Sequence, residues 1–261
     1  RFRIAHVAEA KSLGEPLTKL TAFDAMTASI FDNAGVDTLL VGDSIGTTVF
    51  GEASTLGVTL ADMVRATRSV ANGAKRALIV SDLPFGTYET GPEQAFISAA
   101  ELIRAGANAV KLEGGVRVVE QVKKLVLNGI PVVGHIGFTP QSENILSGPR
   151  VQGRGDDAAD RVLEDAVAVQ EAGASAVVLE MVPAELASRI TSILTIPTIG
   201  IGAGPDTDGQ VLVWSDMVNM TGWQPSFVKV FGEVGNALNA AASDYINAVK
   251  SKSFPSREHS F

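Results

Sequence analysis

Val41-Gly42-Asp43-Ser44 follows a short apolar run that begins at Thr38, and four other apolar runs of the chain end in the same way. The other four endings are Val80-Ser81-Asp82, Val110-Lys111-Leu112-Glu113, Val133-Gly134-His135 and Val178-Leu179-Glu180. Each closes with a side chain that can hold a metal or move a proton. A carboxylate is costly to bury alone, so several that point from parallel strand ends to one place need a shared partner. A divalent cation is the simplest such partner.

Short apolar runs alternate with amphipathic segments along the whole chain. Strands are predicted at 17–22, 38–41, 77–80, 109–112, 131–134, 176–179, 198–201 and 211–214, and helices at 60–71, 92–105, 116–127, 158–172, 184–193 and 227–249. This alternation is typical of a parallel sheet covered by helices. Because 261 residues is the usual length of one eight-stranded barrel, we predict an α/β fold, a single (β/α)8 TIM barrel, with one domain over residues 1–261.

A doubly wound open sheet is the alternative fold. It would need a glycine-rich phosphate fingerprint after its first strand, whereas the turn Gly200-Ile-Gly-Ala-Gly204 comes late and lacks the required spacing. In a barrel this turn ends the seventh strand, where phosphate often binds. The glycines in this turn allow either a close approach of the backbone to a ligand or only a tight turn of the chain.

Composition excludes several classes of partner. The formal charge is −8, from 21 basic and 29 acidic residues, so no basic surface for nucleic acid is expected. The chain has no cysteine, which excludes disulfides and thiolate metal ligands and agrees with a cytoplasmic location. Glu9, Lys11 and Glu15 interrupt the first residues, so we expect no signal peptide, and no stretch is predicted to span a membrane.

Asp43, Asp82 and Glu113 are expected at the ends of three adjacent strands of the barrel. The C-terminal strand ends of such a barrel converge on one active site. Three hard oxygen donors suit Mg²⁺ better than Zn²⁺, so we predict that these residues are metal ligands, with the other coordination positions open to substrate or water. Each one alone could instead cap a helix or pair with Lys111 or an arginine; for all three together this alternative is weaker.

Lys111 precedes Glu113 by two residues, so both side chains face the same side of their strand. A lysine among carboxylates at a barrel mouth is predicted to contact an anionic substrate, and the alternative is a buried counter-ion for Asp82 or Glu113. Ser44 lies in a turn that can present a hydroxyl and a backbone N–H to a carboxylate. Its alternative role is a turn or helix cap.

Glu180 ends the sixth strand, across the barrel from the three predicted ligands. A carboxylate in that place is suited to act as general base, and its alternative role is the N-cap of the helix near Pro183. His135 ends the fifth strand, where it could orient a water molecule, the metal shell or Glu180, or could be a partly buried histidine without such a role.

The chain closely resembles the ketopantoate hydroxymethyltransferase family over nearly its whole length. The motifs are Leu-Thr-Ala-Phe-Asp (20–24), Leu-Val-Gly-Asp-Ser (40–44), Ser-Asp-Leu-Pro-Phe (81–85), Val-Lys-Leu-Glu-Gly-Gly (110–115), Gly-His-Ile-Gly-Phe-Thr-Pro-Gln-Ser (134–142), Val-Gln-Gly-Arg-Gly (151–155), Leu-Glu-Met-Val-Pro (179–183), Ile-Gly-Ile-Gly-Ala-Gly (199–204), Asp-Gly-Gln-Val-Leu-Val (208–213) and Glu-His-Ser-Phe (258–261). Single motifs are weak, but the set in this order is highly specific. Gly57 stands where the family commonly has proline, and Phe23 replaces a frequent tyrosine.

The resemblance implies an Mg²⁺-dependent enzyme of pantothenate biosynthesis. Such an enzyme transfers a hydroxymethyl group from 5,10-methylenetetrahydrofolate to 3-methyl-2-oxobutanoate, giving 2-dehydropantoate and tetrahydrofolate. By resemblance, Asp43, Asp82 and Glu113 bind the metal, Ser44 and Lys111 contact the ketoacid together with the two aspartates, and Glu180 accepts the proton. A large homo-oligomer, typically a decamer, is also implied.

Two other functions are alternatives to this one. A phosphoenolpyruvate mutase or isocitrate-lyase-like barrel also binds Mg²⁺ and a 2-oxo acid, but it normally carries a cysteine in its lid, and this chain has none. A non-catalytic anion-binding barrel is the third possibility.

The longest irregular segment, residues 137–156, is predicted to be a lid or a binding loop.

Overall fold

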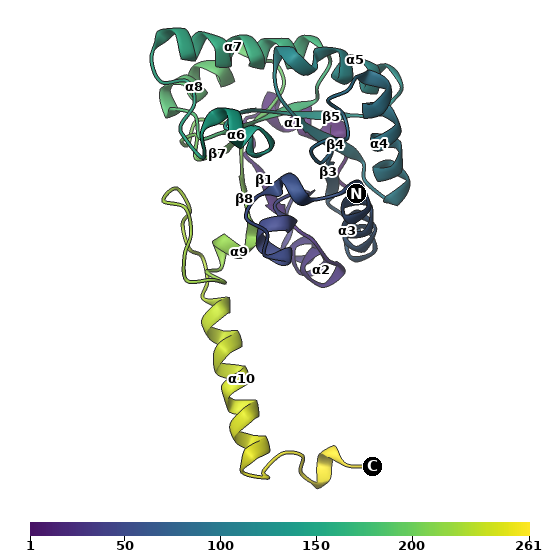
Figure 1. Cartoon of the computed structure of the whole chain (residues 1–261), viewed down its shortest axis with the longest axis vertical. Helices are drawn as coiled ribbons and strands as arrows, with labels where there is room; N and C mark the ends of the chain where they lie inside the picture. Colours follow the sequence, from purple (N-terminus) through teal and green to yellow (C-terminus); the bar gives the residue numbers. More distant parts are fainter. The chain divides into compact units, whose positions relative to one another are not determined.

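Eight parallel strands close into a barrel in the computed structural model, which describes residues 1–261 (Figure 1). The strands are β1 (Leu17–Thr21), β2 (Thr38–Val41), β3 (Leu78–Asp82), β4 (Ala109–Glu113), β5 (Val132–Gly137), β6 (Ala176–Glu180), β7 (Thr198–Ile201) and β8 (Gly209–Leu212). Each pairs in parallel with the next, and β1 pairs with β8. The predicted (β/α)8 fold is confirmed.

The helices cover the outside of this barrel, and α1 closes one end of it. They are α1 (Ile4–Leu13), α2 (Ala25–Ala34), α3 (Leu60–Gly73), α4 (Pro92–Ala105), α5 (Val119–Leu127), α6 (Glu143–Leu146), α7 (Asp156–Glu171) and α8 (Ala184–Ile193). The sequence prediction contained neither α1 nor α2. It also placed β8 two residues late, because Gly209 contributes no apolar side chain to the pattern although it pairs with Leu17.

One apolar cluster fills the barrel. Its members are Leu17, Leu40, Leu78, Val80, Ala109, Val133, Ala176, Val178, Ile199 and Val211 from the strands and Val7 and Ala10 from α1. Side chains two residues apart on a strand share a face, so the inward row of β3 continues from Val80 to Asp82 and that of β4 from Ala109 to Lys111 and Glu113. The positions that fill the core thus lead directly to polar side chains at the C-terminal strand ends.

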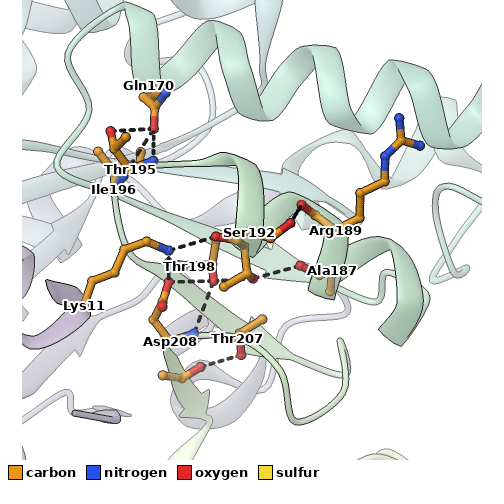
Figure 2. Close-up of polar contacts among 12 residues, drawn as sticks. Lys11, Gln170, Ala187, Arg189, Ser192, Thr195, Ile196, Thr198, Thr207 and Asp208 are labelled. Atoms are coloured by element: carbon orange, nitrogen blue, oxygen red, sulfur yellow. Dashed lines mark hydrogen bonds and ion pairs between the residues drawn. The ribbon is translucent and has the colours of Figure 1, made fainter. Parts of the chain in front are cut away.

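Asp208 joins α1 to the N-terminal ends of β7 and β8 (Figure 2). Its Oδ2 atom lies 2.7 Å from Lys11 Nζ and accepts the backbone N–H of Thr198 at 2.8 Å. Lys11 also donates to the carbonyl oxygen of Thr191 at 2.9 Å. The Lys11 and Asp208 side chains are each 16% exposed, so this ion pair is only partly screened by water. The contact holds the helix that closes the barrel.

Residues Val213–Phe261 form a second compact unit, which contains α9 (Trp214–Met217) and α10 (Val234–Lys250). The predicted helix at 227–249 is therefore shorter at its start, since the segment before Val234 is irregular. The barrel strands all lie within Arg1–Leu212, and the expectation of one domain over residues 1–261 stays a prediction. None of the helices combines the length and the apolar composition needed to cross a bilayer.

We expect Asp208→Ala to lower the free energy of unfolding by about 2 kcal/mol, because it leaves Lys11 and the N–H of Thr198 without their acceptor. Glu120→Gln is the control, since the Glu120–Lys123 pair is exposed and should contribute less than about 0.5 kcal/mol. Urea unfolding followed by circular dichroism measures both. Equal losses in the two variants would contradict the role given to Asp208.

Candidate active site

Five side chains that the sequence singled out meet at the C-terminal end of the barrel. Asp43 follows β2, Asp82 ends β3, Glu113 ends β4, His135 lies in β5 and Glu180 ends β6. The first four are almost fully buried, between 1% and 4% exposed, whereas the side chain of Glu180 is 17% exposed. Four carboxylates thus share one small, mostly dry region.

Lys111 places a positive charge between two of these carboxylates. Its Nζ lies 3.2 Å from Asp82 Oδ2 and 3.8 Å from Glu113 Oε1. Burial alone would lower the pKa of Lys111, but the attraction of Asp82, Glu113 and Asp43 outweighs it and raises that pKa. Lys111 is therefore a buried counter-ion for Asp82 and Glu113, which was the alternative role, and its contact with an anionic substrate stays a prediction.

Asp43 and Asp82 are held close together. The backbone N–H of Asp43 donates to Asp82 Oδ2 at 3.1 Å. Burial, together with repulsion from Asp82 and Glu113, raises the pKa of Asp43 to about 7. Burial likewise raises the pKa of Asp82, although the charge of Lys111 opposes this. The cluster therefore has more negative charge than Lys111 alone neutralises.

Gln141 braces two of the carboxylates from the loop after β5. Its Nε2 donates to Asp43 Oδ2 at 2.8 Å and to the carbonyl oxygen of Leu83 at 3.0 Å, and its backbone N–H donates to Glu113 Oε2 at 3.0 Å. Tyr88 fixes the orientation of this amide, because its hydroxyl lies 2.6 Å from Gln141 Oε1. Sequence reasoning missed both residues. The only sequence signal concerned Gln141, which lies in the motif 134–142 within the long loop.

His135 connects Glu113 to Glu180. Its Nδ1 lies 3.3 Å from Glu113 Oε1 and its Nε2 lies 3.2 Å from Glu180 Oε2. Burial and the neighbouring Lys111 would lower the pKa of His135, but the two carboxylates outweigh them and raise it to about 9. At neutral pH His135 is thus a cation, and the same interaction lowers the pKa of Glu113.

Ser44 lies beside the cluster and is partly exposed. Gly42 makes this approach possible, since a Cβ atom there would lie 2.9 Å from Ser44 Oγ and 3.5 Å from Asp82 Oδ2. The carbonyl oxygen of Ser44 accepts hydrogen bonds from the hydroxyls of Thr47 and Thr48, which fix the following turn. The hydroxyl of Ser44 is left facing the site.

No group of three or more His, Cys, Asp or Glu side chains is spaced to hold a metal ion in this arrangement, in which Lys111 lies against Asp82 and the amide of Gln141 bonds Asp43. However, Asp82 Oδ1 is a buried oxygen without a hydrogen-bond donor. Such an atom, together with the raised pKa values of Asp43 and Asp82, suits a divalent cation with hard oxygen ligands.

The turn Gly200–Gly204 is filled by the chain itself. A Cβ atom at Gly200 would lie 2.7 Å from Thr207 Oγ1, and one at Gly204 would lie 2.5 Å from Ala184 Cβ. Gln210 Nε2 also donates to the carbonyl oxygen of Gly204 at 2.9 Å. Close packing within the turn thus accounts for these glycines.

Lys19 is a second lysine inside the barrel that the sequence analysis did not single out. It lies on β1, on the same face as Leu17 of the apolar cluster, and it is 5% exposed. Burial lowers the pKa of Lys19 to about 8; attraction to Asp82 opposes the shift and repulsion from Lys111 adds to it. Lys19 therefore places a positive charge beneath the carboxylates, and the burial of this charge lowers the free energy of unfolding.

Comparison with known proteins gives a consistent result. A family model described as ketopantoate hydroxymethyltransferase matches residues 1–257. A 3-methyl-2-oxobutanoate hydroxymethyltransferase of Mycolicibacterium vanbaalenii is 54% identical, covering 100% of this chain and 94% of that protein. The protein of the same name from Thermobifida fusca is 53% identical, with the same coverage.

Solved structures with low sequence identity share the fold. A phosphoenolpyruvate phosphomutase from Streptomyces platensis has a TM-score of 0.66 at 13% identity, covering 96% of this chain and 88% of its own. A phosphonopyruvate hydrolase, solved in complex with oxalate and Mg²⁺, has a TM-score of 0.64 at 10% identity, covering 99% and 93%. At this identity the likeness concerns the barrel alone.

We expect Lys19→Met to stabilise the protein, freed of divalent cations with a chelator, by about 3 kcal/mol at pH 7, because the pKa of Lys19 falls from 10.5 to about 8 on folding. Between these values the folded protein binds fewer protons than the unfolded chain. The contribution of Lys19 to the free energy of unfolding should therefore rise between pH 8 and 10.5, so the stability difference between Lys19→Met and the unsubstituted protein should shrink over that range.

Urea unfolding at a series of pH values measures the difference. Lys123→Met, at an exposed position on α5, is the matched control and should leave the pH dependence unchanged. A pH profile that is identical with and without Lys19 would contradict the assignment.

Proposed function

We propose that this chain, which belongs to the ketopantoate hydroxymethyltransferase family, transfers a hydroxymethyl group from 5,10-methylenetetrahydrofolate to 3-methyl-2-oxobutanoate. The products are 2-dehydropantoate and tetrahydrofolate, and the chain would act in pantothenate biosynthesis in the cytoplasm. The observation that carries the proposal is the buried cluster of Asp43, Asp82 and Glu113, with Glu180 held 3.2 Å from His135 at its edge.

Asp43, Asp82 and Glu113 would hold one Mg²⁺ ion. The unpartnered Oδ1 atom of Asp82 supports this assignment, and the amide of Gln141 would turn from Asp43 when the ion enters. When bound, the ion would draw electrons from the keto group of the substrate and so make the neighbouring C–H bond more acidic. Its charge would also resolve the repulsion that raises the pKa of Asp43.

Lys111 and Ser44 would bind the carboxylate of the ketoacid. Lys111 remains charged because three carboxylates raise its pKa, so it offers a stable partner for an anion. The Ser44 hydroxyl, partly exposed beside Asp82, supplies a hydrogen-bond donor. With its carboxylate held by these two groups, the ketoacid would be fixed in one orientation within the site.

Glu180 would remove the proton from that branched carbon. It is more exposed than the three predicted metal ligands, which suits a group that must reach substrate. His135, a cation at neutral pH, has its Nε2 atom 3.2 Å from Glu180 Oε2 and would keep this carboxylate ionised. The deprotonated carbon then forms a bond to the one-carbon unit of the donor as one C–N bond of the donor breaks. Water supplies the hydroxyl group as the second C–N bond breaks.

The chain would assemble into a large homo-oligomer, a decamer by resemblance to its family. Sedimentation velocity of the full chain tests this part of the proposal. A monomer at micromolar concentration would contradict it.

We expect Glu180→Gln to stop exchange of the branched C–H of 3-methyl-2-oxobutanoate for deuterium in heavy water, with a loss of at least about 100-fold. Binding of the ketoacid should stay within about threefold, because the amide removes the base and leaves the other contacts in place. Proton NMR measures the exchange and calorimetry the binding. Exchange at the unsubstituted rate would remove Glu180 from the role of base.

Asp82→Asn should weaken Mg²⁺ binding by at least about 100-fold, because it replaces a charged ligand at the centre of the cluster. Titration calorimetry in the presence of the ketoacid measures the affinity directly, without relying on turnover. The control is Asp62→Asn on α3, where the carboxylate caps the helix through Thr59 and lies outside the site. Similar affinities in the two variants would argue against Asp82 as a ligand.

A further inference from the structure

A cavity of about 450 Å³ lies beside the carboxylate cluster, outside the barrel wall. It is bounded by the segment after β4, the loop after β5 and the first half of α7. Gly114, which follows Glu113 directly, forms part of its wall. None of the residues assigned so far to the ketoacid or the metal lines this cavity, so it is free for another ligand.

This cavity shares two lining residues with a smaller one that reaches the active site. The smaller cavity, about 320 Å³, is lined by Glu113 and Gln141. Arg117 and Ser142 line both cavities, and the Arg117 guanidinium donates to Ser142 Oγ at 2.7 Å. The exposed Arg117 side chain therefore lies at the boundary between the two spaces.

Two charged side chains of the larger cavity keep atoms that are free to bind a ligand. Arg161 on α7 is exposed and forms no ion pair. Asp165 accepts the backbone N–H of Val116 with Oδ1 at 2.9 Å, which leaves Oδ2 available, and burial raises the pKa of Asp165. Gly115 permits this position of Asp165, since a Cβ atom there would lie 1.8 Å from Oδ1.

The rest of the lining suits a flat ring system. Ile136, Ile145, Leu146 and Val162 provide apolar walls. A partly buried carboxylate accepts the paired N–H groups of an aminopyrimidine edge, and an unpaired guanidinium binds a carboxylate. Of the two substrates in the proposed reaction, only the one-carbon donor has a bicyclic aminopyrimidine ring and a separate carboxylate tail.

We propose that this cavity binds the reduced pteridine donor, with Asp165 receiving its aminopyrimidine edge and Arg161 binding its glutamate carboxylate. Arg117 lies at the boundary through which the one-carbon unit meets the ketoacid. The inference rests on the proposed function and adds a site to it. It accounts for the two arginines beside this cavity that form no ion pair, in a chain whose net charge is −8.

The first test uses Asp165→Asn, which keeps an acceptor for the N–H of Val116 but replaces the other oxygen with a donor. The Kd for tetrahydrofolate, measured by calorimetry on the full chain, should rise by at least about tenfold. Deuterium exchange of the ketoacid should stay unchanged, which shows that the variant is folded and that the ketoacid site is intact. Unchanged tetrahydrofolate affinity would overturn the assignment of Asp165.

The second test compares tetrahydrofolate with tetrahydropteroate, which lacks the glutamate tail. Arg161→Gln should weaken tetrahydrofolate binding by about tenfold and leave tetrahydropteroate binding unchanged. Arg104→Gln, on α4 and outside the cavity, is the control and should affect neither ligand. Equal losses for both ligands, or no loss for either, would overturn the role of Arg161.

The two proposals fail in different ways. If the unsubstituted chain binds tetrahydrofolate and forms 2-dehydropantoate but both variants behave like it, the cavity assignment alone is wrong. If the unsubstituted chain binds no tetrahydrofolate and makes no product from the donor, the proposed function is wrong, and the donor site is overturned with it.

Discussion

Repulsion among buried carboxylates is the constraint on which the active end of this barrel depends. Asp43, Asp82 and Glu113 lie almost fully buried; Lys111 contacts Asp82 and Glu113, and His135 contacts Glu113, whereas Asp43 has no cation in direct contact. Burial and the repulsion from its two neighbours raise the pKa of Asp43, and Oδ1 of Asp82 has no hydrogen-bond donor. The proposed dication would relieve the repulsion and would supply a partner for this oxygen.

The barrel separates this costly arrangement from the contacts that stabilise the fold. On β3 and β4 the inward row runs from apolar residues near the N-terminal end to Asp82, Lys111 and Glu113 near the C-terminal end. At the N-terminal end α1 covers the apolar cluster, and the Lys11–Asp208 pair fixes that helix (Figure 2). Substitutions at the two ends should therefore affect stability and chemistry separately.

The strand ends were predictable because each joins a local apolar run to a polar residue, and barrel geometry then brings distant strand ends together. That logic found Asp43, Asp82, Glu113, His135 and Glu180, all of which the structure gathers at one end. Gln141 could not be found in this way, since its side chain bonds Asp43, 98 residues away, from a loop without periodicity. Lys19 could not be found in this way either, because it lies in the middle of its strand and not at the end. Helix α1 was not predicted because its apolar residues are too evenly spread to mark one face.

The three carboxylates from neighbouring strands are proposed to share one divalent cation. The most direct measurement is a crystal structure grown with Mn²⁺ and 3-methyl-2-oxobutanoate, with data collected for anomalous scattering. One strong anomalous peak is expected within coordination distance of oxygens of Asp43, Asp82 and Glu113, with the ketoacid chelated to the same ion. Lys111 still bridging Asp82 and Glu113, with no anomalous peak among the carboxylates, would contradict it.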